Sequence, residues 1–139
     1  MYPDFKILIV DDFALIRTMM KQSLMELGFS NLEEASDGVE AMTKIEAATS
    51  AGQAYSCVFL DWNMPRMTGL EVIQKCKSTP EYEAIPFVMI SAERETESVV
   101  RALEAGALDF ISKPFTPEAL HSKLQKILLD EPEQRAANE

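Results

Sequence analysis

Acidic, hydroxyl and amine side chains each stand directly after a short, mostly apolar run in this chain of 139 residues. Runs of four or five such residues are typical of strands that are buried on both faces. The polar residues that follow these runs are Asp11 and Asp12, Asp61, Ser91, and Lys113. If the strands are parallel, all five side chains reach one edge of a sheet, and α/β proteins bind ligands at that edge.

Three carboxylates gathered at one edge would repel one another. Two carboxylates about 5 Å apart repel by roughly 3 kcal/mol at an effective dielectric of about 20, which is large beside a total stability of about 5–15 kcal/mol. A hard divalent cation relieves this repulsion, and Mg²⁺ commonly takes one or two carboxylates, several waters and a phosphate oxygen. Such a site suits phosphoryl transfer, in which a metal and a lysine stabilise the phosphoryl oxygens and a carboxylate can be the nucleophile.

Each of these residues also has a purely structural explanation when it is taken alone. Asp61 could only open a loop, and Asp12 could cap the first helix. Ser91 could be a loop hydroxyl and Lys113 a surface charge. Helix capping does not explain why the acids gather where one cationic side chain arrives, so the joint pattern favours a functional site.

Composition limits the classes of protein and partner. The chain has 47% hydrophobic and 26% charged residues and a formal net charge of −10, which predicts one soluble globular domain without a membrane span. The negative charge argues against nucleic acid or an anionic membrane surface as a partner, and it favours a cation or a basic partner. We expect no secretory signal. Cys57 and Cys76 lack metal-ligand spacing and are expected to be buried free thiols in a reducing cytoplasm.

Hydrophobic periodicity predicts five strands that alternate with five helices. The strands are expected at 6–10, 32–35, 57–60, 86–90 and 109–112. The helices are expected at 13–27, at 38 to about 48, at 69–77, before Gly106, and from Pro117 onward. This alternation implies a parallel sheet with helices on both faces and right-handed crossovers. The fourth helix is predicted to place Val99, Val100 and Leu103 on its apolar side.

Start signals support three of these helices. Asp37 is a candidate cap for the second helix, with Glu40 three residues later. Thr68 and Glu71 have the spacing of a capping box. Thr116, with Pro117 at the first helical position, starts the last helix.

These motifs together resemble the receiver domain of two-component response regulators, most closely the stand-alone chemotaxis type, CheY. The resemblance runs from about residue 5 to 129 and leaves 130–139 as a polar tail. It is carried by Val10-Asp11-Asp12-Phe13, Glu34-Ala35-Ser36-Asp37-Gly38, Asp61-Trp62-Asn63-Met64-Pro65, Gly69-Leu70-Glu71, Ser91-Ala92 and Lys113-Pro114-Phe115. It implies an α/β, flavodoxin-like (βα)5 fold with strand order 2-1-3-4-5, an order for which CheY-type proteins are themselves a standard example.

The resemblance also implies a role for each acid. Asp61 would accept a phosphoryl group from a phosphohistidine on a separate histidine kinase. Mg²⁺, for which Mn²⁺ can substitute, would be bound directly by Asp12 and Asp61 and mostly through water by Asp11. The backbone carbonyl of Asn63 would complete the protein ligands. The single histidine, His121, falls on the last predicted helix and is interpreted as a solvated position, so the phosphodonor is another molecule.

A second set of residues would convert phosphorylation into a change of surface. Lys113 would pair with the phosphoryl oxygens, and Ser91 would hydrogen-bond to one of them. Movement of Ser91 would reposition Phe110 and alter the face formed by the fourth helix, fifth strand and fifth helix. Asn63 and Glu93 match the chemotaxis type, in which the phosphoryl group is short-lived.

The protein is thus expected to be a cytoplasmic, monomeric signalling switch rather than an enzyme, with self-phosphorylation from small donors and autodephosphorylation. Its expected partners are the kinase, an output protein such as the flagellar motor switch, and a phosphatase. Two departures bear on the output. Phe110 stands where chemotaxis members usually have tyrosine, and residues 94–97 are mixed in charge where those members carry lysines.

Other functions remain open on the residues alone. A Mg²⁺-dependent phosphatase of the haloacid-dehalogenase type would need an acid two residues after Asp61, where this chain has Asn63. A flavodoxin-like or dinucleotide-binding module would need a glycine-rich first turn instead of Asp11-Asp12-Phe13. A receiver that serves only as a docking scaffold is a third possibility. A stand-alone receiver could also act on a non-motor partner, as a phosphate sink or as a regulator of a kinase or cyclase.

Overall fold

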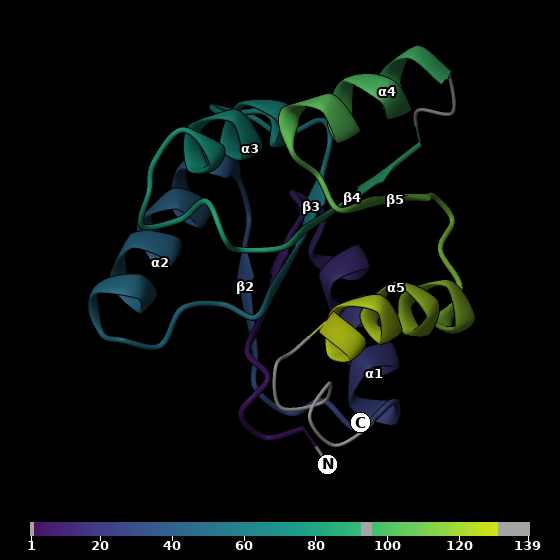
Figure 1. Cartoon of the computed structure of the whole chain (residues 1–139). Coiled ribbons are helices and arrows are strands. Elements are labelled where there is room, and N and C mark those ends of the chain that lie inside the picture. The colour runs from purple at the N-terminus through teal and green to yellow at the C-terminus, as the bar shows by residue number, and fades with distance from the viewer. Residues whose placement is uncertain (1, 93–95, 131–139) are drawn as a thin grey trace.

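One parallel sheet with helices on both faces forms the molecule (Figure 1). The computed structural model describes residues 2–92 and 96–130. Within them the strands are β1 (Ile7–Val10), β2 (Leu32–Ala35), β3 (Cys57–Asp61), β4 (Phe87–Ser91) and β5 (Asp109–Ser112). The helices are α1 (Ala14–Glu26), α2 (Gly38–Ser50), α3 (Gly69–Lys77), α4 (Thr96–Ala105) and α5 (Pro117–Asp130). The strand order is β2-β1-β3-β4-β5, so the predicted fold class and the order implied by the resemblance are confirmed.

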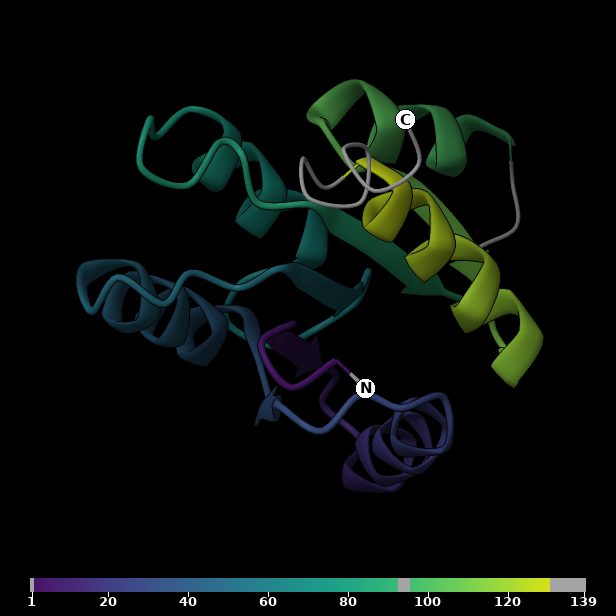
Figure 2. The same ribbon diagram turned by 60° about the horizontal axis from the view of Figure 1, so that its bottom comes forward.

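Alternation along the buried strands creates two cores. One core lies under α2, α3 and α4, and the other lies under α1 and α5 (Figures 1 and 2). The first receives the strand residues Leu8, Val10, Val58, Leu60, Phe87 and Met89. The second receives Ile7, Ile9, Cys57, Phe59, Val88 and Ile90. Because successive side chains of a strand point to opposite faces, the central strands must be apolar at every position.

The predicted caps of α2 and α3 are present. Asp37 accepts the Glu40 N–H at 2.8 Å through Oδ1, while the Glu40 carboxylate accepts the Ser36 N–H at 2.6 Å. Glu40 thus reaches one residue further back than in a capping box. At α3 the box is complete, since Thr68 Oγ1 accepts the Glu71 N–H and the Glu71 carboxylate accepts the Thr68 N–H.

The starts of α1 and α5 differ from each other. Asp12 does not cap α1: the N-cap is Phe13, which makes no side-chain cap hydrogen bond, and the Phe13 N–H donates to Asp11 Oδ1 at 2.9 Å. The capping explanation for Asp12 is therefore wrong. The cap of α5 is as predicted, with Thr116 Oγ1 accepting the Ala119 N–H at 3.1 Å.

The buried side of α4 is not the predicted one. Val100 and Leu103 are exposed, at 43% and 45%, whereas Ala102 is completely buried and Val99 is half-buried. Apolar residues follow two neighbouring lines along this helix, so periodicity alone cannot choose between them. The line with small side chains faces inward, where α4 packs beside α3 and β5. The large side chains are left on the surface.

Helix lengths and cysteines complete the comparison with the expected fold. α2 continues to Ser50, past its predicted end near residue 48. None of the helices in the described residues has the length and apolar character needed to cross a membrane. Cys57 and Cys76 are free and buried, as predicted, and burial raises the pKa of Cys76 to about 11.

Candidate functional site

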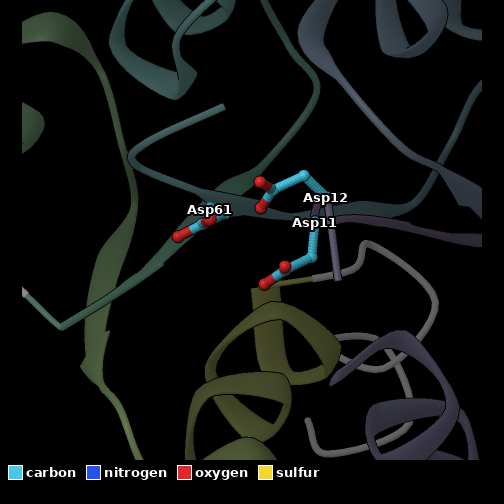
Figure 3. Close-up of side chains that lie close together, drawn as sticks. All are labelled: Asp11, Asp12 and Asp61. Carbon is cyan, nitrogen blue, oxygen red and sulfur yellow. The ribbon is translucent and has the colours of Figure 1, made fainter. Parts of the chain in front are cut away.

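The carboxylates of Asp11, Asp12 and Asp61 meet at the carboxyl edge of the sheet. One oxygen from each lies within 4.8 Å of the others. In Figure 3 the side chains of Asp11 and Asp12 leave the backbone on its Asp61 side. Asp11 and Asp61 are buried, at 2% and 6% exposure, while Asp12 is exposed. The cluster is therefore anchored in the sheet on one side and open to solvent on the other.

Strand register places the acids together. β1 and β3 are parallel neighbours with Val10 opposite Leu60, so Asp11 and Asp61 leave the sheet at the same level. The first turn of α3 then packs directly on the backbone at the carboxyl end of β3: a Cβ at Gly69 would lie 2.2 Å from the Asp61 carbonyl oxygen. Only glycine permits this approach.

Lys113 comes from the far end of the chain to join the cluster. Its Nζ donates to Asp11 Oδ2 at 2.9 Å and to Asp61 Oδ1 at 3.2 Å. The backbone N–H of Lys113 donates to the Ser91 carbonyl at 2.8 Å, which fixes the start of the β5–α5 loop to the end of β4. The predicted convergence of these three acids and the lysine is thus what the structure contains.

The electrostatics of the site follow from this crowding. Burial and the neighbouring Asp11 charge raise the pKa of Asp61 from 3.8 to about 6, with Asp12 adding to the effect and Lys113 opposing it. Burial alone would lower the pKa of Lys113, but its hydrogen bond to Asp11 and the charges of Asp61 and Asp11 raise it. The lysine is thus held protonated, and its one charge leaves the three carboxylates with excess negative charge.

Arg17 holds the backbone of Asp11 in place, and the sequence did not single it out. Its Nη1 donates to the Asp11 carbonyl at 2.6 Å and its Nε donates to Glu34 Oε1 at 3.0 Å. Lys21 also donates to Glu34, at 3.1 Å. The only signal in the sequence was a basic residue near the start of a helix, where the helix dipole disfavours it. Its partner depends on the pairing of β1 with β2.

The other predicted site residues lie in three different environments. Ser91 ends β4 beside the acidic cluster and is 1% exposed. Phe110 lies in β5 opposite Met89 and is partly buried against the core under α2, α3 and α4. Asn63 is exposed in the loop after β3. Glu93 falls outside the described residues. The chemical roles of all these residues remain predictions.

The donor set fits a hard divalent cation. It consists of carboxylate oxygens from three residues, close enough to share one ion, with one side open for water or a phosphate oxygen. Mg²⁺ prefers oxygen ligands and keeps part of its water shell. Soft or nitrogen ligands are lacking in the described cluster, so zinc or copper would fit less well.

Comparisons with known proteins agree with this geometry. Residues 7–125 match the family described as response regulator receiver domain. The chain is 39% identical over 123 residues to the chemotaxis protein CheY1 of Helicobacter pylori, covering 88% of this chain and 96% of that protein. It is 39% identical over 124 residues to CheY-3 of Vibrio cholerae, covering 89% and 92%.

Solved structures give the same result. CheY4 of Vibrio cholerae has a TM-score of 0.78 and 34% identity and covers 88% of this chain and 98% of its own. The CheX-CheY-BeF3-Mg²⁺ complex of Borrelia burgdorferi has a TM-score of 0.80 and 28% identity, with 88% of both chains covered. Because the receiver-domain family matches residues 7–125 and CheY proteins 39% identical to the chain cover most of its length, the chain belongs to the response regulator receiver domains of two-component signalling and is of the chemotaxis CheY type.

Proposed function

We propose that this protein is a phosphorylation switch in which Asp61 accepts a phosphoryl group from a phosphohistidine of a separate kinase. Asp12 and Asp61 would hold Mg²⁺ directly, Asp11 mostly through water, and Asn63 through its backbone carbonyl. When bound, the ion would neutralise charge between the carboxylates and the incoming phosphoryl group. The observation that carries the proposal is the ion pair of Lys113 with Asp61 inside a three-carboxylate cluster.

The side chains are suited to this chemistry. The nucleophile has to be ionised, and a carboxyl with a pKa of about 6 is mostly ionised at neutral pH. The ammonium of Lys113 lies 3.2 Å from Asp61 Oδ1, close enough to contact an oxygen of a phosphoryl group carried by that residue. The phosphodonor would approach Asp61 from the open side of the cluster, where Asp12 is exposed. Ser91, buried at the end of the next strand, would hydrogen-bond to another phosphoryl oxygen.

The output surface would be the face of α4, β5 and α5. It carries exposed apolar side chains at Val100, Leu103 and Leu108. Beside Phe110, Asp109 forms ion pairs with Lys123 and Lys126 on α5, at 3.2 and 2.7 Å. A surface that combines apolar groups with lysines already paired to an acid favours a partner with an apolar contact face.

Relatives support a role in chemotaxis. The Borrelia burgdorferi structure contains CheY with CheX, BeF3 and Mg²⁺, and we extend a Mg²⁺-dependent phosphorylated state to this chain by analogy. We propose a cytoplasmic, monomeric switch whose partners are a kinase, an output protein such as the flagellar motor switch, and a phosphatase. Phe110 has no hydroxyl to offer a partner, so a non-motor target is the second candidate. A pull-down with and without beryllium fluoride distinguishes the two by the protein captured.

Fluorescence of Trp62 tests the phosphorylation step. This side chain adjoins Asp61 and has the Arg101 guanidinium 5.9 Å from its ring centroid. We expect Mg²⁺ to quench Trp62, a small phosphodonor such as acetyl phosphate to change the signal further, and the protein mass to rise by one phosphoryl group. Asp61→Asn should gain no mass. Asp4→Asn, the same substitution at an exposed position before the amino end of β1, should behave as wild type.

The same experiment separates the rival functions. A flat Mg²⁺ titration, with Asp61→Asn indistinguishable from wild type, would support a docking scaffold and contradict the switch. Repeated turnover of a phosphate monoester would support a phosphatase of the haloacid-dehalogenase type, although Asn63 lacks the acidic proton that such an enzyme uses.

A further inference from the structure

The loop between β3 and α3, residues 62–68, is tied to the start of α2 by an ion pair. Arg66 Nε and Nη2 both donate to Asp37 Oδ2, at 3.0 and 2.6 Å. We propose that this ion pair positions the loop that carries Asn63 and thereby sets the affinity of the acidic cluster for Mg²⁺. Arg66 is then a positioning residue. The inference rests on the proposed function, in which the Asn63 carbonyl is a ligand.

Asp37 is a fixed anchor for the loop. Its Oδ1 accepts the Glu40 N–H at the start of α2, which leaves Oδ2 for Arg66. The side chain of Asp37 is only 10% exposed, although that of Arg66 is 60% exposed. The hydrogen bond from the Glu40 N–H, followed by that from Arg66, lowers the pKa of Asp37. The carboxylate therefore stays ionised and links the helix to the loop.

The backbone of the loop also lies directly against α2. A Cβ placed on Gly38 would lie 2.4 Å from the Met67 carbonyl oxygen and 2.6 Å from the Met67 Cβ. This contact leaves no gap in which the loop could shift toward the helix. The contact limits movement in one direction, and the ion pair limits movement in the other.

Arg66 itself adopts a backbone conformation that arginine disfavours. Its φ is +67°, and the Met67 N–H donates to the Pro65 carbonyl at 2.7 Å, so the chain closes a tight turn around Arg66. A left-handed non-glycine residue persists only when its surroundings hold it. The ion pair with Asp37 supplies such a constraint, because it fixes the side chain on which the turn is centred.

The constrained turn and the acidic cluster share one short loop. The loop begins at Trp62, directly after Asp61, and the Gly69 N–H donates to the Trp62 carbonyl at 3.0 Å. Its ends are thus fixed by β3 and α3, and Met64 is buried at 8% exposure. Asn63 lies between the fixed start and the turn at Arg66. Loss of the ion pair would let the Asn63 carbonyl vary in position while the three carboxylates keep theirs.

Calorimetric titration with Mg²⁺ and the rate of phosphorylation by acetyl phosphate test the inference. Arg66→Gly removes the ion pair while keeping a residue that tolerates positive φ. We expect it to weaken Mg²⁺ binding by roughly tenfold, the scale seen when a supporting contact of a metal ligand is lost, and to slow phosphorylation at limiting Mg²⁺ but not at saturating Mg²⁺. Arg66→Lys should be intermediate. Lys75→Gln, which also removes one positive charge but from the exposed side of α3, should match wild type.

The melting temperature in metal-free buffer separates positioning from general stability. Arg66→Gly should melt close to wild type while its Mg²⁺ affinity falls, which a purely structural ion pair would not produce. Equal Mg²⁺ affinity in wild type and Arg66→Gly would overturn the inference and leave the proposed function standing. A phosphorylation rate that stays low at saturating Mg²⁺, or a lysine variant no better than the glycine variant, would also overturn it. Failure of the wild type to bind Mg²⁺ would overturn the proposed function and the inference with it.

Discussion

Each end of the parallel sheet has an acid in contact with a lysine, but the pKa of that acid shifts in opposite directions at the two edges. At the amino edge, Glu33 accepts a hydrogen bond from the Tyr55 hydroxyl at 2.7 Å and pairs with Lys6 at 3.4 Å. Burial alone would raise the pKa of Glu33, but the Tyr55 hydrogen bond and the Lys6 charge outweigh it and lower that pKa. At the carboxyl edge, the pKa of Asp61 rises to about 6 although Lys113 contacts it.

The difference is one of balance rather than of residue type. At the amino edge one acid meets one cation and one hydroxyl, and Glu33 is 40% exposed. At the carboxyl edge three acids lie together and Lys113 pairs with two of them, Asp11 and Asp61, whose carboxylates are only 2% and 8% exposed. A balanced cluster stabilises the fold by itself, whereas an unbalanced one costs stability until a cation binds. The imbalance marks the edge at which we propose that Mg²⁺ binds.

Removing the lysine from each edge should have the largest effect. Lys6 and Lys113 are similarly buried, at 13% and 19% side-chain exposure, so Lys6→Met is a matched control for Lys113→Met. We expect Lys113→Met to lower the free energy of unfolding by about 2–3 kcal/mol in metal-free buffer, because it leaves two buried carboxylates unpaired. Lys6→Met should cost about 0.5–1 kcal/mol. Urea unfolding measures both, and equal losses would contradict the contrast between the edges.

Removing one acid from each edge should change stability in opposite directions. Asp61→Asn relieves repulsion and should raise the free energy of unfolding by about 1–2 kcal/mol at neutral pH without metal. Asp12→Ala should also raise it, but by less, because Asp12 is exposed. Glu33→Gln loses a charge-assisted hydrogen bond and should lower it by about 1 kcal/mol. Thermal melts in a chelating buffer give the signs. If Asp61→Asn and Asp12→Ala both melt lower than wild type, the crowding explanation is wrong.

Acidification should produce the smallest effect, and its sign distinguishes the edges. The pKa of Asp61 is raised in the folded state, so its favourable contribution to stability is present below its ordinary value of 3.8 and is lost as the pH rises through about 6. The pKa of Glu33 is lowered, so its contribution to stability is present above pH 4.5 and is lost only in more acidic solution. Between about pH 7 and pH 5, wild type should gain about 1 kcal/mol relative to Asp61→Asn without metal. Glu33→Gln should gain as much as wild type, and the absence of any gain in wild type would contradict the raised pKa.

Much of the fold and most of the candidate site followed from local sequence. The apolar runs that end at Asp11, Asp61 and Ser91 predicted strands whose polar ends meet, because parallel strands share one carboxyl edge. The caps at Thr68 and Thr116 were predictable because a cap depends on residues within one helical turn. The strand order came from the family resemblance, since nothing local specifies which buried strands are neighbours.

Only the tertiary structure decided which partners these residues take. The ion pair of Lys113 with Asp11 joins residues 102 positions apart, and that of Arg66 with Asp37 joins residues 29 apart. The choice of Ala102 over Leu103 as the buried side of α4 likewise depended on the space beside α3. Residue type and spacing determine which elements form and what chemistry they carry. Contacts between distant elements depend on packing and register, and these are properties of the whole sheet.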